Sequence, residues 1–206
     1  MDYALNALLG YLLGSIPFGL VVGFIWLRRD IRESGSGKTG TTNVLRTAGK
    51  TAAALVLLCD LAKGAAPALI GRFAFDDDNV AAVGAAMAIV GHVFPVFAGF
   101  RGGRGVATAF GGILGLTPLL ALVFPVVGIA LIVPTRIVSV MSVVGTPIAV
   151  AVLFVAAAIG ESPWAFAFYG LAALAVIEYM HIPNIRRLLA GTEPRLGKGG
   201  DRPATG

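Results

Sequence analysis

Apolar runs long enough to cross a lipid bilayer recur along the whole chain, and they constrain its fold more than any other feature. A membrane-spanning helix needs about 20 apolar residues. Only 13% of the 206 residues are charged and 57% are hydrophobic, whereas a soluble domain carries about 25% charged residues. Because so few charges cannot cover the outside of a soluble domain, the sequence predicts an all-α integral membrane protein. The candidate spans are 3–27, 51–71, 79–100, 137–159 and 163–180.

The stretch 105–133 has no charged residue, yet it is too long for one upright span. As a single helix it would measure about 43 Å, against a hydrocarbon core of about 30 Å. Pro118, near its middle, cannot continue the helical hydrogen-bond ladder. We therefore expect two short spans or a re-entrant hairpin here, either of which returns the chain to the side it came from. The whole chain then has about seven transmembrane helices.

The basic residues predict how these helices are oriented, because cytoplasmic loops collect Lys and Arg. With seven elements and the N-terminus outside, 14 of the 16 basic residues lie on the inner side and the C-terminus is cytoplasmic. We expect residues 1–196 to form one domain and residues 197–206, rich in Gly and Pro, to be a disordered tail. The inner segments hold Arg28, Arg29, Arg32, Lys38, Arg46, Lys50, Arg101, Arg104, Arg136, Arg186, Arg187, Arg195, Lys198 and Arg202.

Three segments are too polar and too rich in glycine to be simple connectors: 33–46, 91–105 and 178–187. In the seven-helix arrangement all three meet the same membrane face. We therefore expect the functional residues to lie in these three segments.

The first segment combines features that favour an anion. Glycines 35 and 37 allow consecutive backbone N–H groups to point into one concavity. Ser36 and Thr42 add hydroxyl donors, and Arg46 adds a fork suited to phosphate. The run Gly37-Lys38-Thr39 matches the end of a nucleotide-binding P-loop, but Arg32 stands where that pattern requires glycine. No buried strand precedes the run, so we do not favour an NTPase.

The second segment repeats the combination in Arg101-Gly102-Gly103-Arg104, where a cation stands on each side of an approachable backbone. A simpler alternative is that both segments are flexible loops whose cations face anionic lipid head groups. That alternative explains the charges but not the two constellations of glycine with hydroxyl or arginine. We favour phosphate binding.

The third segment contains His181 and Asn184, which lie one turn apart if the helix continues. Pro183 suggests instead that a helix restarts there, since proline suits a first turn. The pair could hold a substrate hydroxyl, or His181 could simply sit against the negative end of a helix dipole. We expect His92 to pack rather than react. Neither histidine has a carboxylate at metal-ligand spacing, so we expect no metal and no cofactor.

Two charged residues fall inside the second span. Asp60 and Lys63 stand at i and i+3, so they can pair on one helix face. Charges at that depth often mark function, but we favour a self-neutralising pair that faces the bundle. In the first span, Gly14, Ser15 and Pro17 suggest a kink packed closely against a neighbour.

The polar segments carry three motifs: Gly35-Ser36-Gly37-x-x-Gly40-x-Thr42-Asn43, Gly91-His92-x-x-Pro95-Val96-Phe97 continuing to Gly102-Gly103-Arg104-Gly105-Val106-Ala107-Thr108, and His181-x-x-Asn184-Ile185-x-Arg187-Leu188-Leu189-x-Gly191-x-Glu193. The order and spacing of these motifs together resemble a known family, the membrane acyl-phosphate:glycerol-3-phosphate acyltransferases (the PlsY family). The resemblance extends over nearly the whole chain.

The resemblance implies a seven-helix enzyme of the bacterial plasma membrane, with its active site at the cytoplasmic face. It implies transfer of a fatty acyl group from acyl phosphate to the 1-hydroxyl of glycerol 3-phosphate. The products would be lysophosphatidic acid, the first intermediate of phospholipid synthesis, and phosphate. It also implies no metal, and no acyl carrier protein or coenzyme A thioester as the direct donor. No obligatory protein partner is evident from the sequence, and nothing in it points to nucleic acid.

The resemblance also assigns site residues by position. The family's serine falls on Ser36, its arginine on Arg46 and its lysine on Arg104, with its histidine and asparagine on His181 and Asn184. The family often has Asn-Val where this chain has Lys38-Thr39, and Lys where it has Arg101 and Arg104. We expect Ser36, His181, Asn184 and Arg104 to be catalytic. The expected phosphate-binding residues are Arg46, Gly35, Gly37, Lys38, Thr42, Asn43, Arg101, Gly102 and Gly103.

Several chemical alternatives remain open at this point. An acyl phosphate is already activated, so the enzyme mainly has to position and neutralise two anionic substrates. His181 could act as general base, or the leaving phosphate could take the proton. A covalent acyl-Ser36 intermediate needs a base that is absent nearby in sequence, so we favour direct transfer. The rival class is a transporter of a small anion, but transport sites lie near the bilayer midplane. A passive scaffold would not need the His–Asn pair.

Overall fold

The computed structural model describes residues 1–196, and in this part of the chain all the regular secondary structure is helical, without strands. The predicted disordered tail lies outside the described residues. Within that range, six segments are long and apolar enough to cross a membrane, and one shorter apolar helix, Val106–Leu116, makes a seventh element. The prediction of an all-α membrane fold is confirmed. The six long segments are Asp2–Leu27, Thr41–Phe73, Asp78–Ala98, Pro118–Thr135, Val138–Ala158 and Trp164–Leu189.

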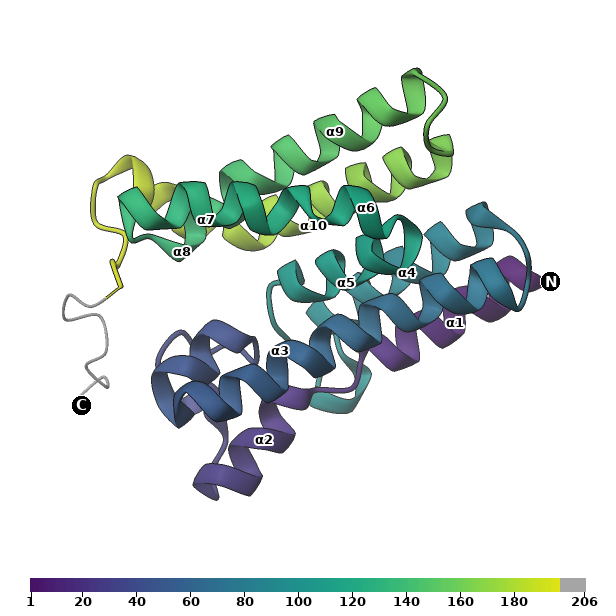
Figure 1. Ribbon diagram of the computed structural model, residues 1–206. Helices are drawn as coiled ribbons and strands as arrows, with labels where there is room; N and C mark the ends of the chain where they lie inside the picture. Colours follow the sequence, from purple (N-terminus) through teal and green to yellow (C-terminus); the bar gives the residue numbers. More distant parts are fainter. Residues whose placement is uncertain (197–206) are drawn as a thin grey trace.

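The helices run roughly side by side, so the chain passes back and forth between two ends of the bundle (Figure 1). The N-terminus lies at one end, and the C-terminal end of the last helix lies at the other. The elements in order are α1 Asp2–Gly14, α2 Phe18–Leu27, η1 Ile31–Glu33, α3 Thr41–Phe73, α4 Asp78–Val93, η2 Val96–Ala98, α5 Val106–Leu116, α6 Pro118–Ala121, α7 Val123–Thr135, α8 Val138–Val140, the π-helical turn η3 Met141–Gly145, α9 Thr146–Ala158 and α10 Trp164–Leu189.

Small residues hold the first helices together. A methyl group added at Gly10 would collide with the backbone of Gly84, and one at Gly14 with the backbone of Ala88, so α1 and α4 touch along their backbones. Gly64 brings α3 equally close to α5. In a membrane, close packing of this kind replaces the water exclusion that drives folding of soluble proteins.

The predicted kink in the first span is a full break between α1 and α2. Pro17 interrupts the hydrogen-bond ladder there, and the Lys63 Nζ donates to the Ile16 carbonyl at 2.9 Å. Lys63 also pairs with Asp60 at 2.9 Å, and both side chains are almost completely buried. Asp60 lies 3.6 Å from the Nδ1 of His92. The pair is therefore buried in the bundle and serves the packing around this break.

The long apolar stretch 105–133 is divided where the sequence predicted. Thr117 is non-helical, with φ −150° and ψ 84°, and Pro118 starts the next helix. With 11 residues, α5 is about 17 Å long and cannot cross the hydrocarbon core alone. Its last carbonyls accept from Arg72, at 2.8 Å for Leu116. A short α5 followed by a full-length α6–α7 segment therefore occupies this region.

Two boundaries differ from the prediction. The helix does not restart at Pro183, because α10 runs unbroken from Trp164 to Leu189. Membrane helices tolerate proline where neighbouring groups satisfy the freed backbone. The second span begins at Thr41 rather than 51, with a local break at Gly49 (φ 87°, ψ −178°). This extension puts Thr42, Asn43 and Arg46 on the first turns of α3.

Candidate active site

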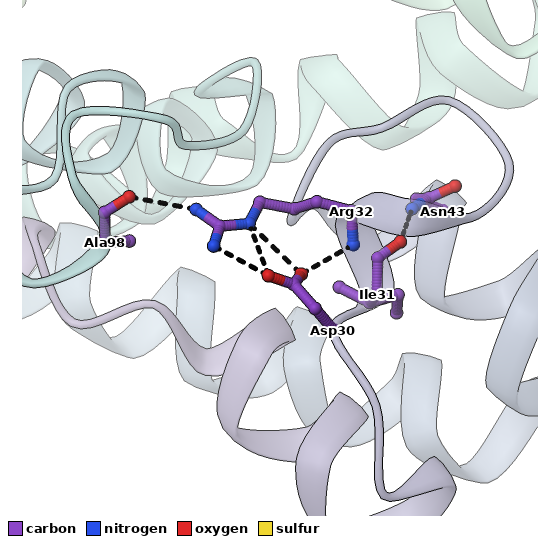
Figure 2. A network of polar contacts seen from close by, with 5 residues as sticks. All are labelled: Asp30, Ile31, Arg32, Asn43 and Ala98. Atoms are coloured by element: carbon purple, nitrogen blue, oxygen red, sulfur yellow. Dashed lines mark hydrogen bonds and ion pairs between the residues drawn. The ribbon is translucent and has the colours of Figure 1, made fainter.

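Asn43 shapes the loop that precedes α3. Its Oδ1 accepts the N–H of Ser36 at 2.8 Å, and its Nδ2 donates to the carbonyls of Ile31, Ser34 and Lys38 at 3.0, 3.1 and 2.8 Å. Figure 2 shows the contact with Ile31. The Asn43 side chain is only 2% exposed. Instead of being free for phosphate, as the sequence suggested, its amide is occupied by the loop backbone.

Gly35 meets Asn43 so closely that only glycine fits. Its φ is +63°, and a Cβ there would collide with the Asn43 Oδ1. The N–H groups of Ser36 and Gly37 are both used inside the loop: Ser36 donates to the Asn43 Oδ1, and Gly37 donates to the Ser34 carbonyl at 3.2 Å.

The α3 N-terminus has no side-chain cap, so its first N–H groups, on Thr41 and Thr42, are oriented to receive an anion. The Ser36 side chain, on the loop that Asn43 holds, is exposed.

The glycines of the second loop also have internal partners. The N–H of Gly102 donates to the Val93 carbonyl and that of Gly103 to the His92 carbonyl, each at 3.2 Å. A Cβ at Gly103 would collide with the His92 ring. These glycines therefore pack the loop against the end of α4, rather than opening their N–H groups to phosphate as predicted. Arg101 and Arg104 flank these two packed glycines in the sequence.

Four cations from the first two segments form a group that we call the cation cluster: Lys38, Arg46, Arg101 and Arg104. Burial lowers the pKa of Lys38, and the charges of Arg104 and Arg101 lower it further. Burial also lowers the pKa of Arg104, while Glu193 opposes this and Arg187 and Arg46 add to it. These mutual effects show that the three polar segments, far apart in sequence, lie close together.

The cation cluster has excess positive charge. Among residues 1–196, the carboxylates within ion-pair distance of a cation pair with other residues: Asp30 with Arg32, Asp60 with Lys63, Asp78 with Arg72 and Glu193 with Arg187. The Nε of Arg104 is buried without a hydrogen-bond partner in the described part of the protein. A buried, unpartnered guanidinium nitrogen is costly, so this group is suited to an anionic ligand.

His181 and Asn184 lie buried on α10, at 2% and 3% exposure. The Nδ1 of His181 lies 2.8 Å from the Ile177 carbonyl. Since a carbonyl only accepts, Nδ1 carries the hydrogen and Nε2 is left as an acceptor. The Nδ2 of Asn184 donates to Glu193 at 2.6 Å, and its Oδ1 is buried without a partner among the described residues.

Glu193 connects the end of α10 to α8, a role that the sequence interpretation did not assign although it lies in the third motif. It accepts from Ser139 at 2.7 Å, from Asn184 and from Arg187 at 2.7 Å. Burial raises the pKa of Glu193, but these hydrogen bonds and the Arg187 charge outweigh it, and the result lies below the ordinary value. Glu193 therefore fixes the orientation of Asn184.

An apolar cavity adjoins the polar site. Its volume is about 20 Å³, and α5, α7, α9 and α10 enclose it. Val106, two residues after Arg104, and Ile177, one turn before His181, both line it. The lining of the cavity therefore comes within two residues of Arg104 and one helical turn of His181 along the chain.

Comparison with known proteins identifies the family of the chain. Residues 4–191 match the family model described as glycerol-3-phosphate acyltransferase. A glycerol-3-phosphate acyltransferase of Allorhizobium ampelinum is 42% identical over 196 residues, covering 93% of this chain and 91% of the relative.

Solved structures agree in fold. The crystal structure of PlsY, an integral membrane glycerol 3-phosphate acyltransferase, in its glycerol 3-phosphate form superposes with a TM-score of 0.88 at 39% identity, covering 96% of each chain. The lysophosphatidic acid form of PlsY gives 0.87 at 37% identity, covering 98% of each chain. The chain spans nearly the full length of these proteins, and it belongs to the glycerol-3-phosphate acyltransferase family of integral membrane enzymes.

Proposed function

We propose that this acyltransferase uses acyl phosphate as its donor and works at the cytoplasmic face of the membrane. The observation that carries the proposal is the cation cluster, whose positive charges have no carboxylate partners among the described residues. An acyl phosphate and glycerol 3-phosphate each carry a phosphate group into the site. Arginine forks and a helix N-terminus are suited to binding both.

The residues divide the work as follows. Lys38, Arg46, Arg101 and Arg104, with the N-terminus of α3, bind the two phosphates. The Nε2 of His181 accepts from the attacking 1-hydroxyl and orients it. The unpartnered Oδ1 of Asn184 accepts from the other hydroxyl of the glycerol. The exposed Ser36 hydroxyl donates to a phosphate or to the carbonyl oxygen under attack. Asn43, Gly35, Gly37, Gly102 and Gly103 hold the loops in shape.

The transfer is direct. The glycerol oxygen attacks the acyl carbonyl, and the bond from the carbonyl carbon to the phosphate oxygen breaks, with phosphate leaving as an anion. The hydroxyl proton passes to His181 Nε2 or to the departing phosphate. A covalent acyl-Ser36 route is disfavoured because no hydrogen-bonded base approaches the Ser36 hydroxyl in the described residues. The apolar cavity lies where the first carbons of the acyl chain would enter the bundle.

Charge supports the cytoplasmic orientation. At one end of the bundle α2 ends, α3 begins and α10 ends (Figure 1). These helix ends and the loops beside them carry Arg28, Arg29, Lys50 and Arg186 besides the cation cluster. The opposite end carries Asp76, Asp77, Asp78 and Glu161. Because basic segments remain in the cytoplasm, the site faces the compartment that contains glycerol 3-phosphate. A small-anion transporter would instead need its polar groups near the midplane.

The donor is tested with detergent-purified protein, synthetic palmitoyl phosphate and glycerol 3-phosphate. Lysophosphatidic acid and inorganic phosphate should appear in equal amounts without ATP or added metal. Palmitoyl-CoA in place of palmitoyl phosphate should give no product. Activity with palmitoyl-CoA alone would reject acyl phosphate as the donor while keeping the acyltransferase class.

A further inference from the structure

Arg32 differs from the cations of the cluster because it has a carboxylate partner, Asp30. Its Nε lies 3.1 Å from both carboxylate oxygens of Asp30, and its Nη2 lies 2.7 Å from Oδ2. Its Nη1 donates to the Ala98 carbonyl at 2.9 Å (Figure 2). Arg32 side-chain hydrogen bonds therefore join the loop after α2 to the loop after α4. These are the loops that lead to Ser36 and to Arg101.

The Ala98 carbonyl belongs to an unusual turn. The N–H groups of Ala98 and Phe100 both donate to the Pro95 carbonyl, at 3.1 and 2.8 Å, and the Arg101 N–H donates to the Ala98 carbonyl at 3.4 Å. Gly99 and Phe100 are both left-handed, with φ of 63° and 59°. That conformation costs a non-glycine residue about 1–2 kcal/mol.

Nothing in the packing of Phe100 offsets this cost. Phe100 is 60% exposed, so side-chain packing contributes little, and the hydrogen bonds at the Pro95 and Ala98 carbonyls are the contacts that hold the turn. Arg32, from a distant part of the chain, donates one of these hydrogen bonds to the Ala98 carbonyl. Asp30 holds the Arg32 fork in place, since both Nε and Nη2 donate to it. The charge of Arg101 lies close enough to lower the pKa of Asp30, after the larger effect of Arg32 itself.

We propose that Arg32 is a positioning residue for acyl transfer: through the Ala98 carbonyl it holds the strained turn that aims Arg101 into the cation cluster. This rests on the proposed role of Arg101 in phosphate binding. Arg32 acts through the turn rather than on substrate, because its Nε and Nη2 donate to Asp30 and its Nη1 donates to the Ala98 carbonyl. Loss of Arg32 lets the turn relax, and Arg101 then leaves its phosphate.

A double-mutant cycle between Arg32 and Arg101 tests the inference. The variants are Arg32→Gln, Arg101→Gln and the two combined, with kcat and KM measured for both substrates. Displacing a substrate-positioning group by about 1 Å can cost on the order of 100-fold. We expect Arg32→Gln to lower kcat/KM by about 10-fold or more, mostly through a higher KM for one phosphate substrate. The combined variant should be no worse than Arg101→Gln, because Arg32 acts through Arg101.

Two further variants serve as controls. Arg29→Gln removes an exposed cation from the same connector, and it should retain wild-type kinetics. Arg32→Lys keeps the charge but cannot donate as a fork to Asp30 and also reach Ala98. It should therefore resemble Arg32→Gln, and it replaces that variant in the cycle if Arg32→Gln fails to fold, as judged by thermal unfolding in detergent.

Three results would overturn the inference. Wild-type kinetics in both Arg32 variants would show that the turn does not need Arg32. Losses that multiply in the combined variant would show that Arg32 and Arg101 act separately. An impaired Arg32→Gln beside a fully active Arg101→Gln would show that Arg32 does not act through Arg101. Only this last result also removes Arg101 from the proposed phosphate site.

Discussion

The Nδ1 of His181 lies 2.8 Å from the carbonyl oxygen of Ile177, one turn earlier on α10. This contact fixes the ring and leaves Nε2 as the reactive nitrogen. General acid–base groups contribute about 10²- to 10⁴-fold to catalysis. We expect His181→Ala to lower kcat by about 100-fold or more, with thermal unfolding in detergent as the control for folding. A kcat equal to that of the wild type would assign the proton to the leaving phosphate instead.

Asn43 makes four hydrogen bonds to the backbone around Ser36. Each buried polar group left without a partner costs about 1–3 kcal/mol, so Asn43→Ala should loosen the loop and abolish most activity. Limited trypsin digestion measures this directly, because cleavage after Lys38 should accelerate. Cleavage after Lys50, outside the loop, is the internal reference. An unchanged ratio of the two cleavages would mean that Asn43 does not hold the loop.

Gly49 interrupts α3 with φ 87° and ψ −178°, and a Cβ there would meet no atom within 4 Å. Any loss of activity in Gly49→Ala therefore comes from backbone strain, because residues with a Cβ rarely adopt this conformation. We expect α3 to straighten, Arg46 to move and kcat/KM to fall.

Gly160 provides a matched control for Gly49. Its φ is 81°, its Cβ would also meet open space, and it lies between α9 and α10 at the opposite end of the bundle. Gly160→Ala should lower the melting temperature by a similar amount and leave kinetics unchanged. Equal kinetic effects in both variants would contradict a specific role for the Gly49 break.

Glu193 makes stability depend on acid pH. Its pKa in the folded protein lies below the ordinary value of 4.5, so its contribution is present above that value and is lost as the pH falls through the folded pKa. The Glu193→Gln variant should be less stable than the wild type at pH 7. The difference in melting temperature should shrink as the pH is lowered below 4.5 and through the folded pKa. A difference that stays constant with pH would show that the carboxylate charge does not matter.

Much of the fold follows from the sequence because lipid selects long apolar runs, and those runs are easy to recognise. The break at Pro118 and the Asp60–Lys63 pair were predictable for a different reason, because each is decided by residues close in sequence. The predicted helix start at Pro183 was wrong because a membrane helix tolerates a proline in its interior where neighbouring groups satisfy the freed backbone.

The details of the site were less predictable because distant residues decide them. Gly102 and Gly103 have the same composition as an open phosphate loop, but the carbonyls of Val93 and His92 take up their N–H groups. The contact of Arg32 with Ala98 depends on two loops 66 residues apart. Glu193 stood in a motif, yet only the folded chain brings it to Ser139 and Asn184.

The most direct test of the account is calorimetric binding of glycerol 3-phosphate to the purified wild type and to Arg46→Gln and Arg104→Gln, with Arg28→Gln as an exposed matched control. Hydrogen bonds to charged groups contribute about 1.5–3 kcal/mol, so binding should weaken roughly 10- to 100-fold when either cluster arginine is lost. The Arg28 variant should bind like the wild type. Wild-type affinity in both Arg46→Gln and Arg104→Gln would contradict the claim that the cation cluster is the phosphate site.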